Sequence, residues 1–229
     1  MSKKLSRRQY DAQIAHEQLR MLEFGRAIYK CRVPVLCVME GWDAAGKGGA
    51  IKRITYTLDP RGFTVASFTA PRGDEKTHHY LWRFWRNLPR AGHLTVFDRS
   101  YYGRVLVERV EKFSTRQECS RAYQEINEFE SHQLSSGMVI VKFWLHITRQ
   151  EQLHRFKNRE FDPFRSYKLT EEDWRNRESW EDYQDAVEEM FLRTSTPTAP
   201  WTVVEAEDKF FARVKVLRTL ADAIEKRLS

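Results

Sequence analysis

The sequence predicts a three-layer α/β fold, in which a parallel β-sheet is covered by helices on both faces. Three observations predict it. Short apolar runs alternate with longer helix-like segments along the 229 residues. The apolar runs are continuous, as expected of strands that are buried on both faces. The first run leads through a glycine-rich turn into a helix start, the order in which α/β proteins build a ligand-binding turn.

Five runs rich in β-branched and aromatic residues are predicted to form the strands. These runs are residues 33–40, 63–70, 93–99, 138–147 and 201–206. Because helical segments separate them, the strands are expected to run parallel to one another.

The segments between the runs are predicted to be helices. Thr170 followed three residues later by Asp173 is a typical helix start signal. The predicted helices are residues 11–31, 46–58, 75–88, 117–135, 149–159, 171–194 and 207–227. No repeat, low-complexity tract or linker divides the chain, so residues 1–229 are predicted to form a single domain.

The composition is that of a soluble globular protein, with 41% hydrophobic and 31% charged residues. No window approaches the roughly 18 uncharged apolar residues of a membrane span, and the basic N-terminus lacks the apolar core of a secretory signal. Cys31, Cys37 and Cys119 are an odd number without a C-x-x-C pair. Cys31 and Cys37 flank and occupy an apolar run, which predicts reduced, buried thiols in a cytoplasmic protein.

The formal net charge of +7 has two interpretations. It is either a diffuse surface charge that aids solubility or the mark of a polyanionic partner. No zinc-finger, RNA-recognition or heptad signature favours nucleic acid. The basic residues are spread along the chain, so any anion site must be assembled by folding.

Residues 41–48, G-W-D-A-A-G-K-G, match the Walker A pattern G-x-x-x-x-G-K and are called the glycine loop below. The loop lies between a predicted strand and a predicted helix, which is the context of a phosphate-binding loop. Gly41 and Gly46 let the backbone turn its N–H groups toward an anion, and Lys47 adds a positive charge. The alternative is a glycine-rich turn with a solvated lysine. The remaining predicted phosphate-binding residues of the loop are Ala44, Ala45 and Gly48.

Two acids are candidates for holding a metal ion. Gly48 stands where many such loops have a Ser or Thr that ligates magnesium, whereas Asp43 lies within the loop. Asp98 ends the predicted strand 93–99, in the place of the Walker B acid that helps to hold magnesium. Asp98 is therefore predicted to help hold magnesium, whereas the residues alone leave open why an acid, Asp43, lies inside an anion-binding loop. The alternative for Asp98 is a helix cap.

Three arginines follow at spacings of five: Arg99, Arg104 and Arg109. This spacing does not place all three on one helical face, so a bend must intervene if they meet one substrate. As a set beside Asp98, they predict at least one phosphate contact. Any one of them alone would be read as a surface salt-bridge residue.

A second basic segment suggests a lid over approximately residues 152–190. Arg155 and Arg159 are four apart and share a helix face, and Arg165 and Lys168 follow in a Pro-containing loop. A basic lid would cover bound phosphates and exclude water. The alternative is a solvent-exposed charged hairpin.

Aromatic clusters are interpreted as packing rather than as ligand sites. His78 and His79 lack a matching Cys/His cluster, so aromatic packing is favoured over metal ligation. Trp174, Trp180 and Tyr183 could stack on a base, but packing in a core or interface is the favoured interpretation.

Taken together, these motifs resemble the polyphosphate kinase 2 family over about residues 10–225. The family hallmarks, G-x-D-x-x-G-K-G and D-R-S-x-Y, read here "GWDAAGKGG" and "FDRSYYGRV". The resemblance continues through "LDPRGF", "APRGDE", "HHYLWRFWRNLPRAG", "RFKNRE" and "YKLTEEDWRNRESWEDY".

The resemblance implies a thymidylate-kinase-like P-loop fold with a helical lid and a kinase that transfers phosphate from inorganic polyphosphate to a purine nucleotide. The chain is most similar to the branch that converts AMP to ADP, and other branches convert diphosphates to triphosphates. It further implies Mg²⁺, or Mn²⁺ in its place, and a homo-oligomer, either tetramer or dimer, with no nucleic-acid or membrane partner.

The resemblance also implies roles for individual residues. Asp43 and Asp98 match the paired acids that hold magnesium, and Lys47 matches the loop lysine. The predicted catalytic set is Asp43, Lys47, Asp98 and Arg99. The phosphate-binding arginines implied by position are Arg99, Arg109 and Arg159, to which Arg104, Arg155 and Lys168 are added.

Two departures from the family pattern stand out. The AMP branch is often a tandem of two such domains, whereas this chain has one. Arg165 and Tyr167 stand where Lys and Trp are usual, which affects the expected affinity for a phosphate chain.

Two other classes of function are kept as alternatives. One is an ATP-dependent nucleotide kinase on the same fold, and the other is a non-catalytic polyanion binder. The presence of both acids with Lys47 argues against the binder, because binding alone would favour a neutral or basic residue at each acid.

Overall fold

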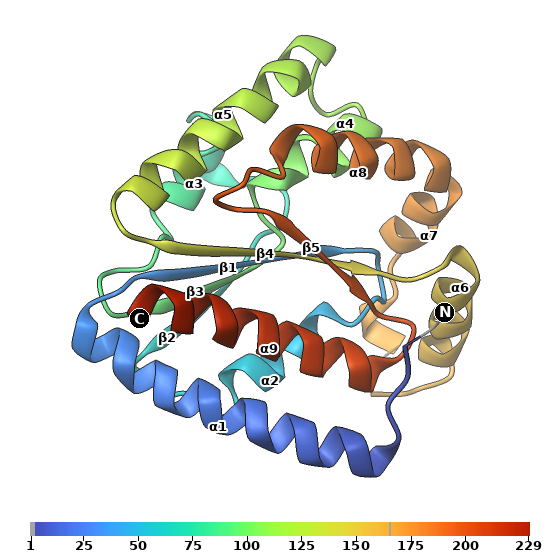
Figure 1. The fold of residues 1–229 in the computed structure, drawn as a ribbon. Coiled ribbons are helices and arrows are strands. Elements are labelled where there is room, and N and C mark those ends of the chain that lie inside the picture. Colours follow the sequence, from blue (N-terminus) through green and yellow to red (C-terminus); the bar gives the residue numbers. More distant parts are fainter. Residues whose placement is uncertain (1–2, 165) are drawn as a thin grey trace.

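The computed structural model describes residues 3–164 and 166–229. Its five strands form one parallel sheet in the order β2-β3-β1-β4-β5 (Figure 1). The strands are β1 (Val35–Gly41), β2 (Phe63–Ser67), β3 (Leu94–Asp98), β4 (Val139–His146) and β5 (Trp201–Glu205). All five predicted strands are therefore confirmed, and so is the parallel sheet.

Helices cover both faces of this sheet (Figure 1). One face carries α1 (Arg7–Cys31), α2 (Lys47–Thr55) and α9 (Lys209–Leu228). The other carries α3 (Trp82–Trp85), α4 (Val107–Val110), α5 (Arg116–Ser135) and α8 (Trp180–Thr194). Beyond the carboxyl ends of the strands lie α6 (Arg149–Glu160) and α7 (Glu171–Glu178). The short 3₁₀ turns are η1 (Gly73–Lys76), η2 (Tyr101–Arg104) and η3 (Ser166–Lys168). The three-layer α/β prediction is confirmed.

Burial of the three central strands explains why β1, β3 and β4 read as continuous apolar runs. In β1, every residue from Val35 to Glu40 is buried, and all but the last residue of β4 is buried as well. Because helices cover both faces, alternate side chains of one strand enter different apolar layers. The sheet therefore presents its polar groups mainly where the strands end.

The predicted helix over residues 75–88 is wrong in extent. The structure has η1 and the four-residue α3 in its place. The Thr77 hydroxyl donates to the backbone oxygen of Asp74, and His78 stacks on Trp82 with ring centroids 4.0 Å apart. Side-chain bonds to nearby backbone compete with helix formation, and the aromatic residues of this segment pack locally instead.

The predicted helix over residues 171–194 is two helices, which meet at Ser179. Its predicted start is confirmed, since the Asp173 carboxylate accepts hydrogen bonds at 2.8 Å from the Thr170 amide and at 2.9 Å from its hydroxyl. The break turns α7 away from α8 and toward the glycine loop.

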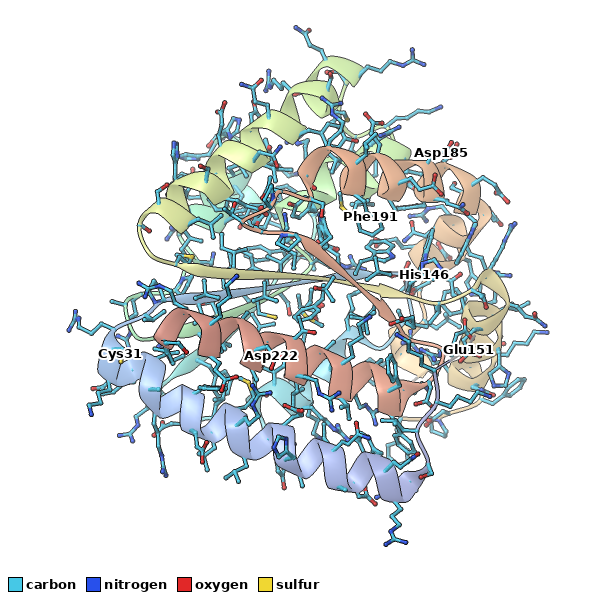
Figure 2. All side chains as sticks on the ribbon, in the orientation of Figure 1. Cys31, His146, Glu151, Asp185, Phe191 and Asp222 are labelled. Atoms are coloured by element: carbon cyan, nitrogen blue, oxygen red, sulfur yellow. The ribbon has the colours of Figure 1, made fainter. Side chains whose placement is uncertain are left out.

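One of the two thiols predicted to be buried is exposed. Cys37 in β1 is buried, but Cys31 lies at the exposed end of α1 (Figure 2). Cys31 is the last residue of the helix, and the C-cap that follows it, Arg32, adopts the left-handed conformation. No helix within the described residues is long and apolar enough to cross a membrane.

Candidate functional site

The glycine loop connects the carboxyl end of β1 to the first turn of α2. Gly41 and Gly46 have φ values of +145° and +111°, which glycine tolerates and other residues rarely adopt. A Cβ on Gly41 would lie 2.5 Å from the backbone oxygen of Leu145 in β4. Only glycine therefore lets the loop leave the sheet at this position.

The start of α2 is left open to an anion. Its N-cap, Gly46, has no side chain to satisfy the first amide groups, and a Cβ on Gly46 or Gly48 would meet no atom within 4 Å. Uncapped amides and the positive end of the helix dipole together favour a bound anion. The Lys47 ammonium lies across the loop and donates to the Gly41 oxygen at 2.6 Å.

Arg155 of α6 supports the loop from behind. Its buried guanidinium donates to the backbone oxygens of Ala44 and Ala45, each at 3.0 Å, and to those of Ala206 and Glu207 at 2.7 and 3.0 Å. Glu151, one turn earlier on α6 (Figure 2), accepts from its Nε at 2.6 Å. Arg155 thereby holds the carbonyl side of the glycine loop. Phosphate binding by Arg155 stays a prediction, and the contacts in the structure give it a supporting role.

The end of β3 brings the second predicted acid to the same edge of the sheet. Asp98 pairs in register with Met39 of β1, two residues before Gly41. No described residue donates a hydrogen bond to the Asp98 carboxylate. The next residue, Arg99, has φ = +64°, an uncommon value for a non-glycine residue.

Arg99 faces both the loop and α7. One Nη atom lies 3.9 Å from Oδ1 of Asp43, and the other lies 3.6 Å from Oε1 of Glu172. Both separations are longer than a good hydrogen bond. Asp43, Asp98 and Arg99 therefore lie at the same carboxyl edge of the sheet, with Lys47 on the same loop as Asp43, and their catalytic roles stay predictions.

A fourth carboxyl group, Glu40, was missed at the sequence level. It is the last buried residue of β1, and it accepts a hydrogen bond of 2.7 Å from the Ser100 hydroxyl. Burial raises the pKa of Glu40 to about 7, although Ser100, Lys47 and Arg99 each act to lower it. A single Glu at the end of an apolar run gave no signal in the sequence, because only the fold places it beside Asp98.

A buried group of hydrogen-bonded side chains holds the segment after β3 in place. It is called the buried cluster and consists of Tyr101, Tyr102, Glu130, Lys142 and Thr194. Lys142 of β4 donates to Oε2 of Glu130 at 2.7 Å, to the Tyr102 hydroxyl at 2.9 Å and to the Thr194 oxygen at 2.8 Å. The Tyr101 and Tyr102 hydroxyls both donate to Oε1 of Glu130 at 2.8 Å. The two tyrosines that follow the predicted Asp98–Arg99 pair are thereby anchored in the core.

The lid prediction can be compared with the contacts of α7 and α8. Asn176 of α7 donates to Oδ2 of Asp43 at 2.9 Å. Trp180 stacks on Trp42 of the glycine loop, with centroids 3.8 Å apart and planes 9° apart, and Tyr183 packs against the same ring. Trp180 and Tyr183 thus pack as favoured at the sequence level, and they do so against the loop itself.

The other predicted basic residues lie further from the two acids. Arg109 donates to Glu189 of α8 at 2.6 Å and to the Tyr123 hydroxyl at 2.8 Å. Arg104 pairs with Glu108 at 3.0 Å and lies over the Tyr80 ring. No contact between described residues brings either arginine to Asp43 or Asp98, and their phosphate roles stay predictions.

Three basic residues of the predicted lid complete the account. Arg159 is half-buried near the end of α6. Arg165 and the side chain of Lys168 lie outside the described residues, so their predicted roles are not tested here.

The residues present fit a magnesium ion. Mg²⁺ is usually held by one or two carboxylates together with waters and substrate phosphates, rather than by a cage of protein ligands. Asp43 and Asp98 supply two carboxylates on neighbouring segments, and the Asp98 carboxylate has no hydrogen-bond donor among the described residues. No three His, Cys, Asp or Glu side chains gather into a possible metal site within the described part of the chain, so waters and phosphate oxygens would have to complete the coordination.

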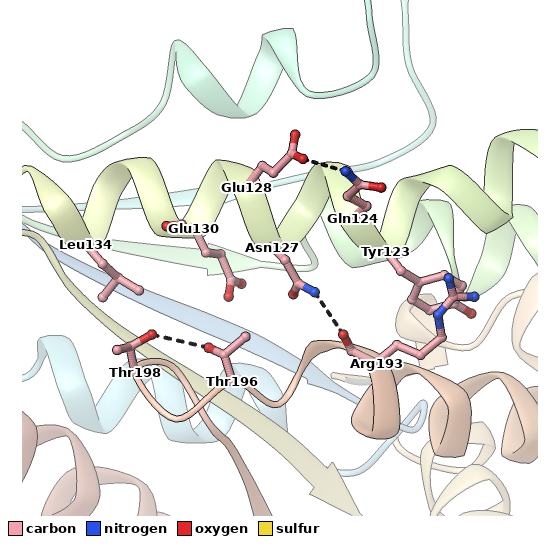
Figure 3. Close-up of a pocket in the computed structure, with 10 residues that line it drawn as sticks. Tyr123, Gln124, Asn127, Glu128, Glu130, Leu134, Arg193, Thr196 and Thr198 are labelled. Atoms are coloured by element: carbon pink, nitrogen blue, oxygen red, sulfur yellow. Dashed lines mark hydrogen bonds between the residues drawn. The ribbon is translucent and has the colours of Figure 1, made fainter.

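Two hollows differ in their relation to this edge. A groove of about 470 Å³ between α5 and the end of α8 contains none of the predicted site residues, and Asn127 there donates to the Arg193 oxygen at 2.9 Å (Figure 3). A pocket of about 350 Å³ lies at the end of β2 and includes Ser67, which pairs in register with Asp98. The charged residues that line this pocket are Arg72, Glu75 and Arg83.

Comparison with known proteins places this geometry in context. Residues 4–229 match the family model described as Polyphosphate kinase 2. The chain is 52% identical over 226 residues to a Polyphosphate:AMP phosphotransferase of Pseudomonas syringae pv. tomato, covering 99% of this chain and 45% of the relative. It is 54% identical over 216 residues to the Polyphosphate:AMP phosphotransferase of Pseudomonas aeruginosa, covering 94% and 44%.

The fold comparison agrees. A crystal structure of a Pseudomonas aeruginosa PA01 protein superposes with a TM-score of 0.95 at 52% identity, covering 98% of this chain and 49% of that one. The chain thus spans about half the length of these relatives.

Proposed function

The chain belongs to the polyphosphate kinase 2 family, and we propose that it transfers the terminal phosphate of inorganic polyphosphate to AMP, giving ADP. Diphosphates are proposed as secondary acceptors. The observation that carries the proposal is the meeting of Asp43, Lys47, Asp98 and Arg99 at the carboxyl edge of the sheet, around an uncapped helix start.

Phosphoryl transfer needs aligned reactants and neutralised charge more than covalent help from the protein. The amides at the start of α2 and the Lys47 ammonium would bind the oxygens of one phosphate. Arg99, which holds its two carboxylate partners only loosely, can turn its guanidinium to the phosphate that moves.

Asp43 and Asp98 would hold Mg²⁺, or Mn²⁺ in its place. When bound, the ion would neutralise charge on the phosphate oxygens, so that two phosphate chains can approach each other. This also gives a reason for an acid inside an anion-binding loop, since the carboxylate would meet the phosphate through the cation.

The acceptor is proposed to occupy the pocket at the end of β2. Ser67 of this pocket pairs in register with Asp98, and Arg72 and Arg83 offer positive charge for a monophosphate. Arg83 already donates to the Thr69 oxygen at 2.8 Å and pairs with Glu75 at 3.2 Å, so Arg72 is the better candidate for the phosphate contact.

The segment over residues 152–190 is proposed to act as a lid. Its helix α7 contacts both Asp43 and Arg99, so closure would cover the reacting phosphates and exclude water. We further propose a cytoplasmic homo-oligomer, a tetramer or a dimer. Light scattering on the purified chain measures that state.

One assay tests the proposed reaction. The purified chain is incubated with magnesium, AMP or ADP as acceptor, and either long-chain polyphosphate or ATP as donor, and the nucleotides are separated by chromatography. ADP formed from AMP with polyphosphate alone is the expected result. Transfer with ATP alone would favour an ATP-dependent nucleotide kinase, and no transfer with either donor would favour a polyanion binder.

A further inference from the structure

The two oxygens of the Asp43 carboxylate have different partners. Oδ2 accepts a hydrogen bond of 2.9 Å from the side-chain nitrogen of Asn176 on α7. Oδ1 lies 3.9 Å from the Arg99 guanidinium and accepts no hydrogen bond from a described residue. One oxygen is therefore held by the protein, and the other is left for a ligand.

The orientation of Asn176 is fixed by a second hydrogen bond. The Tyr183 hydroxyl lies 3.0 Å from the side-chain oxygen of Asn176 and donates to it. Because a carboxylate only accepts, the amide NH₂ must face Asp43 and the amide oxygen must face Tyr183. Burial, and then the negative charge of Asp43, raise the pKa of Tyr183, so its hydroxyl remains a donor.

Tyr183 is in turn held by the residue next to Asp43. Its buried ring packs at 64° against Trp42, on which Trp180 also stacks. The contacts close a ring, which runs from Trp42 to Tyr183, from there to Asn176, and back to Asp43. A side chain held from two directions keeps one rotamer, so the carboxylate is oriented before any ligand arrives.

We propose that Asn176 and Tyr183 are positioning residues, which hold Oδ2 of Asp43 and thereby direct Oδ1 toward the cation of the substrate complex. The inference rests on the proposed function for the role of Asp43. Asn176 acts on Asp43 directly, whereas Tyr183 acts only through Asn176. Loss of Asn176 should therefore reduce Mn²⁺ binding and turnover more than loss of the Tyr183 hydroxyl, an order that a merely structural contact would not give.

The test compares Asn176→Leu, Tyr183→Phe and the double variant with the wild type. A matched control, Glu181→Gln, breaks the exposed pair between Arg149 and Glu181, which joins α6 to α8 without touching the loop. Electron paramagnetic resonance without nucleotide measures the Mn²⁺ dissociation constant. Steady-state kinetics with polyphosphate measure kcat and the KM for AMP. Melting temperatures monitor folding, and Asn176→Ala replaces Asn176→Leu if the latter does not fold.

We expect Asn176→Leu to weaken Mn²⁺ binding and to lower kcat by about 10- to 100-fold, the usual cost of losing a partner that orients a metal ligand. Tyr183→Phe should have a smaller effect, and it should add nothing in the Asn176→Leu background. Glu181→Gln should match the wild type.

The inference is overturned if Asn176→Leu matches Glu181→Gln in both Mn²⁺ binding and turnover. It is also overturned if the effects of Asn176→Leu and Tyr183→Phe are additive in the double variant. A third contradicting result would be Mn²⁺ binding that is absent from the wild type or is unaffected by Asp43→Asn. The proposed function fails separately, when the wild type makes no ADP from polyphosphate. In that case, the Mn²⁺ affinities of the wild type and the variants still test whether Asn176 and Tyr183 position Asp43.

Discussion

The buried cluster and the carboxyl edge of the sheet both contain charged side chains, but these are paired to different extents. In the buried cluster, Lys142 donates three hydrogen bonds, one of them to Oε2 of Glu130, and Oε1 of Glu130 accepts from the Tyr101 and Tyr102 hydroxyls. At the carboxyl edge, Asp98 accepts no hydrogen bond from a described residue, and the ion pairs of Arg99 are 3.6 and 3.9 Å long.

The difference indicates that the buried cluster serves stability and the carboxyl edge serves chemistry. A buried charge is costly unless protein partners satisfy it, so the buried cluster must be complete in the chain alone. The side chains of Asp43 and Arg99 at the edge are 17% and 46% exposed, so water can satisfy their charges until a ligand arrives. Incomplete pairing at this edge, beside a buried cluster whose charges are satisfied, therefore supports the proposal that phosphate and cation bind there.

The largest expected effect comes from removing a charge at the edge. Asp98→Asn and Asp43→Asn should each lower turnover by about 10³-fold or more, the scale at which charge-neutralising groups act in phosphoryl transfer. Neither should lower the free energy of unfolding by more than about 1 kcal/mol, because neither acid completes a buried pair. Initial rates of ADP formation and urea denaturation measure the two quantities. Near-normal turnover in either variant would remove that acid from the mechanism.

The opposite pattern is expected in the buried cluster. Lys142→Met leaves the Glu130 carboxylate buried without its cation, which should cost about 3–5 kcal/mol of unfolding free energy. Turnover of the folded fraction should stay within about tenfold of the wild type. Combining it with Glu130→Gln removes the stranded charge and should recover part of the stability. A loss of turnover with unchanged stability would contradict the division between the two groups.

Arg155→Lys tests the support of the glycine loop, with an intermediate effect. An ammonium has three donors in place of the guanidinium's five, so it cannot hold the carbonyls of Ala44 and Ala45 together with those of Ala206 and Glu207. We expect a loss of about 1–3 kcal/mol of stability and about a tenfold drop in turnover. If Arg155 instead binds phosphate, the main change would be a higher KM for polyphosphate with stability intact.

The smallest effect is expected at a paired acid far from the edge. Burial raises the pKa of Glu17 on α1, but hydrogen bonds from Arg218 and Arg20 outweigh it and the net pKa is lowered from 4.5. Its contribution to stability is therefore present above pH 4.5 and is lost as the pH falls through the lower folded-state pKa.

Glu17→Gln should thus cost about 1 kcal/mol at pH 7 and less than that near pH 3. Urea denaturation at the two pH values measures this difference. An equal cost at both values would mean that the ionised carboxylate is not what joins α1 to α9.

The sequence was sufficient for the sheet and for the main acids, for physical reasons. Strands buried on both faces leave continuous apolar runs, and glycines needed for positive φ values leave a recognisable loop. Asp43 and Asp98 could be predicted to meet because the carboxyl ends of neighbouring parallel strands share one edge.

What the sequence did not reveal depends on partners that have no sequence signature. The bonds of Arg155 to backbone oxygens could not be predicted, because backbone oxygens are the same for every residue. Glu40 read only as the end of a strand, because its partner Ser100 follows β3 and comes beside it only in the folded sheet. Asn176 was overlooked because its hydrogen bond to Asp43 spans 133 positions.

The most direct test of the central claim, that phosphate is transferred at the carboxyl edge, is label transfer from radiolabelled polyphosphate to AMP. The wild-type chain and Asp98→Asn are compared at matched folded concentration in the presence of magnesium. We predict labelled ADP with the wild type and a rate lower by about 10³-fold with the variant. Equal label transfer by both proteins, or none by the wild type, would contradict the claim.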